Sequence, residues 1–227
     1  MNTAIIVAAG SGSRFASEIP KQFVDLAGKP VIIHTLEKFE ACPAVDQVIL
    51  VLSDDGRDRF EEILDDRSFE KLTKLVAGGS SRAESVKNGL DQVDDTCEIV
   101  AVHDGARPLV SVDEITRTIE AAAQTDAACL VCDVTDTIKQ VENGAIVATV
   151  DRSILRRALT PQAFRADILR RAFEGFVPDD SITDECSMVE KLGQVIACVE
   201  GSPRNLKITR EDDLLIAAAL LDSAASS

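Results

Sequence analysis

The sequence contains no tryptophan and no tyrosine, and only eight phenylalanines. Proteins that hold single-stranded nucleic acid usually stack the bases on aromatic side chains, so this scarcity argues against such a surface. Basic residues are also few, with 24 Lys and Arg against 39 Asp and Glu and a net charge of −15. Binding to a polyanion or an anionic membrane normally needs a basic face. We therefore expect no nucleic-acid partner and no membrane partner.

Long apolar runs and a signal peptide are missing as well. No run is long enough to span a bilayer, so we expect a cytoplasmic protein. Six cysteines are scattered along the chain, mostly inside apolar segments. The spacing of Cys129 and Cys132 occurs in metal and redox sites, but no second pair and no nearby histidine accompanies it. Buried structural thiols are the better interpretation.

What the chain does contain is a regular alternation of apolar and amphipathic segments. This pattern predicts one α/β domain over residues 1–227, with a mostly parallel sheet flanked by helices on both faces. The segments typical of strands are Thr3–Ala9, Gln47–Ser53, Lys74–Ala77, Glu98–His103, Ala127–Asp133 and Val195–Val199. Those with helical spacing are Pro30–Glu40, Gly56–Asp66, Arg82–Gln92, Val112–Gln124, Ala166–Phe173, Asp184–Leu192 and Arg210–Leu221.

One segment interrupts this alternation. Asn143–Gly144 lies between two strand-like stretches, Thr137–Val141 and Ala145–Val150, which is a strong signal for a β-hairpin. A hairpin inserted into a parallel-sheet fold should project from the body. We expect residues 134–150 to form an arm that packs on a second subunit, with a simple surface hairpin as the alternative.

A glycine-rich loop follows the first predicted strand, with the sequence Ala8-Ala9-Gly10-Ser11-Gly12-Ser13-Arg14. In open α/β sheets ligands bind beyond the carboxyl ends of strands, where glycines let backbone N–H groups approach phosphates. The dinucleotide fingerprint fails because Phe15 replaces its third small residue, and no phosphate loop of the G-x-x-x-x-G-K-[ST] type is present. The two cations Arg14 and Lys21 instead suit a triphosphate whose negative charge grows during transfer. A surface turn with solvated charges is the alternative.

Other strand ends carry polar residues too. Gly78–Arg82 opens a helix and offers a flexible backbone, hydroxyls and a cation, although Ser80 or Ser81 would also serve as a simple N-cap. Asp104 emerges from a buried strand and is a natural Mg²⁺ ligand, since that ion prefers few carboxylates plus phosphate oxygens. Arg107 would orient this loop or pair with Asp104. Lys207 ends an apolar segment and needs an anionic partner, either a phosphate or a carboxylate.

Taken together, these segments resemble the 2-C-methyl-D-erythritol 4-phosphate cytidylyltransferase family of the non-mevalonate isoprenoid pathway. The matching stretches occur in order along nearly the whole chain, and their combination is highly specific. They are Ala8–Phe15, Pro20–Gln22, Gly78–Gly79, Arg82 with Ser85–Val86, His103–Pro108, Asp136–Thr137, Val150–Arg152, Thr160–Gln162, Thr183–Glu185 and Asn205–Thr209.

The resemblance implies a Rossmann-like nucleotidyltransferase fold, a homodimer with exchanged hairpin arms, and dependence on Mg²⁺ held by Asp104. It also implies roles for individual residues. Cytosine and ribose would contact Ala8, Ala9, Gly10, Gly79, Ser80 and Ser85, within a nucleotide loop that includes Ser11, Gly12 and Ser13. Arg14, Lys21 and Lys207 would neutralise the triphosphate. The acceptor, methylerythritol phosphate, would contact Arg107, Thr160 and Thr183, with Thr137 and Arg152 reaching across from the partner's arm.

In the implied reaction the phosphate of the acceptor attacks the α-phosphorus of CTP in line, and pyrophosphate leaves. A phosphate dianion needs no general base near pH 7, so catalysis would consist of positioning and charge neutralisation. Ser80 stands where some relatives carry Asp, which weakens the expected contact at that residue alone. The alternatives are a ribitol-5-phosphate cytidylyltransferase, an NAD-dependent dehydrogenase and a non-catalytic nucleotide-binding module.

Overall fold

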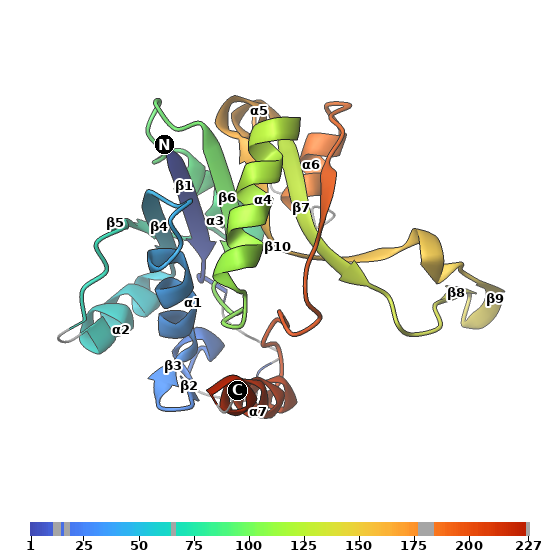
Figure 1. The fold of residues 1–227 in the computed structure, drawn as a ribbon, viewed down its shortest axis with the longest axis horizontal. Coiled ribbons are helices and arrows are strands. Elements are labelled where there is room, and N and C mark those ends of the chain that lie inside the picture. The colour runs from blue at the N-terminus through green and yellow to red at the C-terminus, as the bar shows by residue number, and fades with distance from the viewer. Residues whose placement is uncertain (11–14, 16–18, 65–66, 177–183, 226–227) are drawn as a thin grey trace.

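The computed structural model describes residues 1–10, 15, 19–64, 67–176 and 184–225. Its centre is a seven-stranded sheet in the order β11-β7-β10-β6-β1-β4-β5 (Figure 1). Neighbouring strands are parallel except where β10 pairs with β6 and β7. The strands are β1 (Asn2–Val7), β4 (Gln47–Leu52), β5 (Leu72–Ala77), β6 (Ile99–Asp104), β7 (Ala127–Asp133), β10 (Arg156–Arg165) and β11 (Ala197–Glu200). The predicted mostly parallel α/β fold is confirmed.

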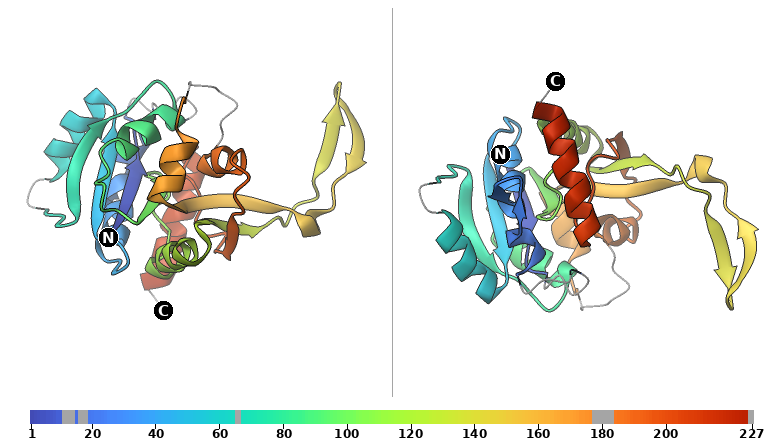
Figure 2. Two further views of the ribbon diagram at one scale, coloured as in Figure 1. Left: turned by 90° about the horizontal axis from the view of Figure 1, so that it is seen from above. Right: turned by 90° about the horizontal axis from the view of Figure 1, so that it is seen from below.

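Helices cover both faces of the sheet because the central strands are apolar on both sides (Figures 1 and 2). In β1, Ala4 and Ile6 face one core, and Ile5 and Val7 face the other. The first core is closed by α1 (Val31–Glu40), α2 (Asp54–Leu64) and α4 (Val112–Thr125). The second is closed by α3 (Arg82–Leu90), α5 (Ala166–Ala172) and α6 (Glu185–Glu190). None of the described helices is long and apolar enough to cross a membrane.

A small third core joins the C-terminal helix to an early part of the chain. Helix α7 (Glu211–Ala225) packs near the two-stranded sheet of β2 (Asp25–Leu26) and β3 (Lys29–Pro30), which follows the short 3-10 helix η1 (Lys21–Phe23). Leu26, Ile208 and Ala217 are buried together at this contact. The contact brings the segment that carries Lys207 next to the segment that carries Lys21, although they are far apart in the sequence.

The hairpin consists of β8 (Lys139–Glu142) and β9 (Ala145–Thr149), followed by the 3-10 turn η2 (Arg152–Ile154), and it projects from the body as an arm (Figures 1 and 2). Its turn residues Asn143 and Gly144 have φ values of 50° and 81°. Two-residue hairpin turns need this left-handed backbone, which explains the Asn-Gly pair. The arm leaves the body after β7 and returns into β10.

Strand β10 was not among the predicted strands. Its sequence contains Pro161 and several arginines, and a proline normally argues against a strand inside a sheet. The structure accommodates Pro161 at an irregularity, because the register against β7 shifts between Ala158 and Gln162. This antiparallel strand places Thr160 beside the end of β6, where its hydroxyl accepts a hydrogen bond from the Asp104 backbone N–H at 3.1 Å.

Candidate functional site

The carboxyl ends of β1 and β6 meet at the point where the strand order reverses, which is the usual ligand site of open α/β sheets. Val7 and Asp104 are direct neighbours in the register of these strands. The loops beyond them approach very closely. A Cβ atom on Gly78 would lie 2.2 Å from the Cβ of Ala9, and one on Gly105 would lie 2.8 Å from the Cβ of Ala8. Glycine is therefore required at positions 78 and 105, because the loops that follow β1, β5 and β6 converge there.

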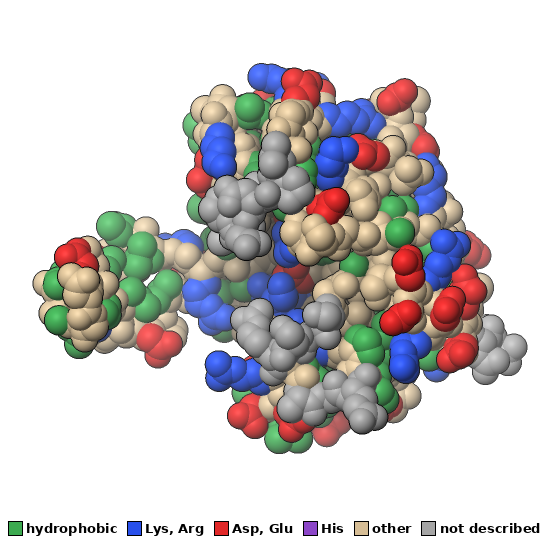
Figure 3. All heavy atoms as spheres, turned by 180° about the vertical axis from the view of Figure 1, so that it is seen from behind, with side chains coloured by type: hydrophobic (Ala, Val, Ile, Leu, Met, Phe, Trp, Pro, Cys, Tyr) green, Lys and Arg blue, Asp and Glu red, His purple; other side chains and the backbone are tan. Residues whose placement is uncertain are grey.

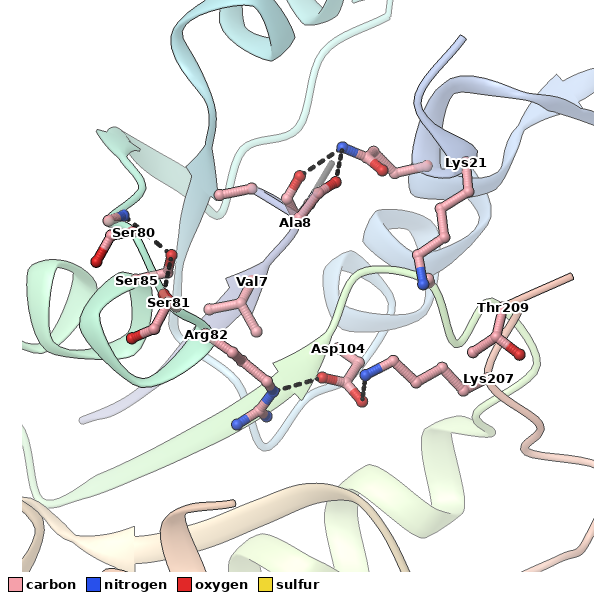
Figure 4. Close-up of a pocket in the computed structure, with 15 residues that line it drawn as sticks. Val7, Ala8, Lys21, Ser80, Ser81, Arg82, Ser85, Asp104, Lys207 and Thr209 are labelled. Carbon is pink, nitrogen blue, oxygen red and sulfur yellow. Dashed lines mark hydrogen bonds and ion pairs between the residues drawn. The ribbon is translucent and has the colours of Figure 1, made fainter. Parts of the chain in front are cut away.

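Two neighbouring pockets open at this edge of the sheet. The larger, which we call the main pocket, has a volume of about 520 Å³ and is lined by Val7, Ala8, Ala9, Gly10, Lys21, Gln22, Gly79, Ser80, Ser81, Arg82, Ser85, Asp104, Ala106, Lys207 and Thr209 (Figure 4). The smaller, which we call the side pocket, has about 220 Å³ and is lined by Arg82, Asp104, Arg107, Ala158, Leu159, Thr160, Gln162, Asp184 and Lys207. The residues common to both are Arg82, Asp104 and Lys207.

Asp104 is the centre of an ion-pair cluster between the pockets. Its Oδ1 accepts from Arg82 Nε at 2.9 Å, and its Oδ2 contacts Lys207 Nζ at 3.0 Å and Arg107 Nε at 3.1 Å. Arg82 and Lys207 point toward it from opposite sides (Figure 4). Burial by itself would raise the pKa of Asp104, but the three cations hold the pKa well below its usual range. The carboxylate therefore stays charged at neutral pH.

The pockets carry a positive charge although the protein as a whole is acidic. Arg82 also pairs with Glu185, whose Oε1 lies 2.6 Å from Arg82 Nη1. The cluster thus holds three positive and two negative groups, and Lys21 adds a further cation whose side chain points into the main pocket (Figure 4). Figure 3 shows Lys and Arg side chains gathered in the hollow of this face. Such a local excess suits a phosphorylated metabolite.

Gln22 fixes the start of the glycine-rich loop and was not predicted as a functional residue. Its buried side chain donates from Nε2 to the carbonyl oxygens of Ala8 at 2.7 Å and Gly10 at 3.4 Å. The signal was present in the sequence, because Gln22 belongs to the Pro20–Gln22 stretch. Glu185 likewise lies in a matching stretch but received no predicted role, and Arg82 was predicted only as a cation at the start of a helix.

The Gly79–Ser85 segment is organised by its own hydrogen bonds. Ser85 Oγ accepts from the Gly79 backbone N–H at 3.0 Å, and Glu84 Oε2 accepts from both the N–H and the hydroxyl of Ser80. Ser81 is the N-cap of α3, accepting from Glu84 N–H. The backbone N–H groups of Gly79 and Ser80 therefore already have acceptors. A ligand here would contact the carbonyl oxygens of these residues, or it would replace Ser85 Oγ or Glu84 Oε2 as the acceptor.

The structure brings most of the predicted site residues together. Those around the two pockets are Ala8, Ala9, Gly10, Lys21, Gly79, Ser80, Ser85, Asp104, Arg107, Thr160 and Lys207. Thr137 and Arg152 lie instead on exposed parts of the arm, where Arg152 donates to the Thr135 carbonyl oxygen, and they line neither pocket. Ser11, Gly12, Ser13, Arg14 and Thr183 lie outside the described residues.

His103 is packed inside the protein and cannot serve the pockets as a base. Its Nδ1 lies 3.0 Å from Thr160 Oγ1 and its Nε2 lies 3.2 Å from the Arg107 carbonyl oxygen. The ring is buried against Phe39. Burial lowers the pKa of His103 to about 3, although the charge of Asp104 opposes the shift. The predicted buried thiols are also found, since Cys129 and Cys132 are free and buried.

Asp104 alone does not form a metal cage. Among the described residues no group of three or more His, Cys, Asp or Glu side chains is placed to hold an ion. Both Asp104 oxygens contact cations, so a metal would compete with Lys207 and Arg107 for Oδ2. Mg²⁺, however, commonly uses one or two carboxylates together with substrate phosphates and water. The site fits an ion that arrives with a polyphosphate, provided that Lys207 moves to the phosphates.

Comparison with known proteins gives a consistent result. Residues 2–223 match the family model of 2-C-methyl-D-erythritol 4-phosphate cytidylyltransferase. Proteins of that name from Acidobacterium capsulatum and Alkaliphilus metalliredigens are 43% and 39% identical to the chain. The alignments cover 96% and 97% of this chain and 95% and 92% of the relatives.

Solved structures agree over nearly the same length. The 4-diphosphocytidyl-2C-methyl-D-erythritol synthase of Anaerococcus prevotii superimposes with a TM-score of 0.86 at 27% identity, covering 97% of this chain and 96% of that one. The 2-C-methyl-D-erythritol 4-phosphate cytidylyltransferase of Francisella tularensis gives 0.78 at 33% identity, covering 95% and 97%.

Replacing His103 should remove a pH-dependent contribution to stability. The pKa of this histidine is about 3 in the folded protein and 6.5 in its ordinary state, so the unfolded chain binds the extra proton first. Its contribution is complete above pH 6.5 and is lost as the pH falls from there toward 3. Between pH 6.5 and 5 the free energy of unfolding should fall by roughly 1.5 kcal/mol more in the wild type than in His103→Gln, as measured by urea denaturation. Equal pH slopes in the two proteins would contradict a neutral, buried His103.

Proposed function

Since the chain belongs to the 2-C-methyl-D-erythritol 4-phosphate cytidylyltransferase family, we infer that it transfers CMP from CTP to 2-C-methyl-D-erythritol 4-phosphate and releases pyrophosphate in isoprenoid biosynthesis. The observation that carries this function is the cation cluster around Asp104, at the junction of two pockets. A reaction between two phosphorylated substrates needs two adjoining sites of this charge. The relatives named above all carry the methylerythritol name, and nothing favours the ribitol phosphate alternative.

We assign CTP to the main pocket. Its volume is that of a typical site for a nucleotide-sized ligand. Gly79 lies just before α3 and Ser85 lies in its first turn. With Ala8, Ala9, Gly10 and Ser80 they would hold the cytosine and ribose. Lys21 and Lys207 lie on the other side of the pocket and would hold the triphosphate (Figure 4). Arg14, Ser11, Gly12 and Ser13 would complete the phosphate loop.

We assign the acceptor phosphate to the side pocket, beside Arg107 and Thr160. Its oxygen would attack the α-phosphorus of CTP, and the bond from the α-phosphorus to the bridging oxygen of pyrophosphate would break. No group needs to remove a proton, because a phosphate dianion is already nucleophilic. Cations that neutralise the growing charge would therefore supply the catalysis, together with alignment of the two phosphates. Thr183 is proposed to complete the acceptor site.

Mg²⁺ is proposed to accompany CTP, with Asp104 as its protein ligand. The ion would neutralise part of the triphosphate charge when bound. On this chain Lys207 would transfer its contact from Asp104 to a phosphate oxygen, and Asp104 Oδ2 would keep its contact with Arg107.

We further propose that the protein works as a homodimer whose arms are exchanged. The arm carries exposed apolar side chains, with 57% of Val141, 67% of Ile146 and 78% of Ile154 accessible. A two-stranded hairpin is only marginally stable alone, so an arm with this surface is expected to pack on another molecule. A second copy would bring Thr137 and Arg152 to the acceptor site, which neither residue reaches within its own chain. The cytoplasmic location stays a prediction.

A pyrophosphate-release assay tests the activity with CTP, Mg²⁺ and either sugar phosphate. We expect turnover of 2-C-methyl-D-erythritol 4-phosphate and little of ribitol 5-phosphate. Chelation of the divalent ion should abolish turnover, and added Mg²⁺ should restore it. Turnover of ribitol 5-phosphate alone would contradict the assigned acceptor, and full activity in the presence of a chelator would contradict the role of the metal.

Lys21→Ala should lower the rate of cytidylyl transfer at least a hundredfold. The lysine is proposed to stabilise charge that develops on the triphosphate, and removing one such donor typically costs a factor of about 10²–10³. The unfolding midpoint should not change. Lys191→Ala, at an exposed lysine beyond α6, is the matched control and should keep wild-type activity. Near-normal turnover of Lys21→Ala would remove it from the mechanism.

Arg152→Ala should raise the KM for the acceptor while leaving the affinity for CTP, measured by calorimetry, nearly unchanged. If arms are exchanged, Arg152 acts in the partner's site. At an acceptor concentration far below the raised KM, both Arg152→Ala and Lys21→Ala should be nearly inactive, and the two variants should then complement each other when co-expressed. Random pairing would restore about a quarter of wild-type activity, because half of the dimers are mixed and one of their two sites is intact. A mixture no more active than its components would show that Arg152 acts within its own chain or not at all.

A further inference from the structure

Arg82 occupies an unusual position, held between two carboxylates from different parts of the fold. Its Nε donates to Asp104 Oδ1 at 2.9 Å, and its Nη1 donates to Glu185 Oε1 at 2.6 Å. Asp104 ends β6, Arg82 begins α3, and Glu185 begins α6. These contacts link the element at the nucleotide side of the site to the element at the acceptor side, across 103 residues of sequence.

Arg82 also belongs to the walls of both pockets, together with Asp104 and Lys207. If CTP fills the main pocket and the acceptor phosphate fills the side pocket, the reacting phosphorus lies where the two pockets meet. The side chains common to both walls are then the ones nearest to it. Among the described residues Nη2 of Arg82 has no hydrogen-bond acceptor, so this nitrogen can donate to a phosphate.

Glu185 is different, because it lines neither pocket. Its side chain has 0% exposure, and its Oε2 has no hydrogen-bond partner among the described residues. Burying a carboxylate is costly even when it is paired, and an apolar side chain of similar size is often as good or better for stability. The neighbouring Met188 and Val189 of α6 already pack into the apolar core. Stability alone therefore does not account for a glutamate at this position.

The geometry of a guanidinium group explains what the glutamate does. The group is planar, so two nitrogens held by two fixed carboxylates determine where the third nitrogen points. Burial would lower the pKa of Arg82, but the charges of Glu185 and Asp104 outweigh it and raise the pKa, so the side chain stays positive. Lysine has a single nitrogen on a flexible stem and cannot bridge both carboxylates in this way.

We propose that Glu185 is a positioning residue that acts through Arg82: it orients the Arg82 guanidinium so that Nη2 contacts the phosphate at the junction of the two pockets. Arg82 stays protonated throughout and would align the attacking oxygen with the α-phosphorus. This inference rests on the pocket assignment proposed above. Glu185, which lies outside both pockets, would then be one of the residues that determine the rate of cytidylyl transfer.

Glu185→Gln tests the proposal, because it keeps the size of the side chain and removes its charge. At saturating CTP and acceptor, kcat should fall about 10–100-fold, the size of effect expected when a reacting group is misplaced. The dissociation constant for CTP, measured by calorimetry without acceptor, should change less than about threefold, since Glu185 does not contact the nucleotide. Glu190→Gln, at the exposed end of the same helix, is the matched control and should behave as the wild type.

A double-mutant comparison separates positioning from a general loss of structure. If Glu185 acts through Arg82, Glu185→Gln combined with Arg82→Lys should be no slower than Arg82→Lys alone. Additive losses, or a kcat of Glu185→Gln within twofold of wild type, would overturn the proposal. Should Glu185→Gln lower the melting temperature strongly, Glu185→Asp keeps the charge and should recover much of the kcat if charge placement is what matters. No recovery would count against it.

Failure of this inference differs from failure of the proposed function. A wild-type chain with no turnover of either sugar phosphate overturns the function, and the inference with it. An active wild type in which Lys21→Ala is impaired but Glu185→Gln is not overturns the inference alone.

Discussion

The site depends on one buried carboxylate. Asp104 is placed by β6, in register with Val7 of β1. It receives two cations from distant segments, Arg82 from α3 and Lys207 from the segment before α7, and a third, Arg107, from its own loop. A buried anion of this kind would be strongly unfavourable alone, whereas the cations would repel one another without it. The carboxylate and the three cations therefore stabilise one another in their charged forms. The result is a compact group of donors at the edge of the sheet.

This arrangement explains how a protein with a net charge of −15 can handle two phosphorylated substrates. The positive charge is not spread over a face, as in proteins that bind nucleic acid, but is confined to the junction of two pockets. Within the cluster two carboxylates already balance two of the three cations. A substrate phosphate can replace Asp104 as the partner of Lys207 without leaving a cation unpaired. Binding then exchanges one ion pair for another, which keeps the cost of desolvation low.

The projecting arm lacks a packing partner within the described part of the single chain. Its apolar side chains are exposed in the single chain, and two residues expected at the acceptor site are carried on or beside it rather than near the pockets. In the proposed assignment the body supplies the contacts to the nucleotide and part of those to the acceptor, and the arm supplies the remaining acceptor contacts. A division of this kind makes the acceptor site incomplete in one copy, which is the physical reason for proposing exchange between two copies.

Much of the fold follows from local patterns. Buried parallel strands are apolar on both faces, so segments such as Ala127–Asp133 were recognised with the bounds that the structure shows. Asn143–Gly144 predicted the hairpin for an equally local reason, because few residues adopt its backbone angles. Strand β10 was missed because Pro161 contradicts the local preference, and only the irregular pairing with β7 accommodates it. Because β7 is separated from β10 by the arm, local sequence preferences could not reveal this pairing.

For the site, the sequence by itself determined which residue types follow the strand ends, and so it predicted a phosphorylated ligand at the loops after β1, β5 and β6. It left open whether Lys207 faces a phosphate or a carboxylate, and the structure answers with Asp104 at 3.0 Å. The sequence did not predict that Glu185 pairs with Arg82, because an ion pair between residues 103 positions apart produces no periodic pattern in the sequence. Tertiary structure decided these contacts, since strand order and helix packing, not spacing along the chain, determine which charges meet.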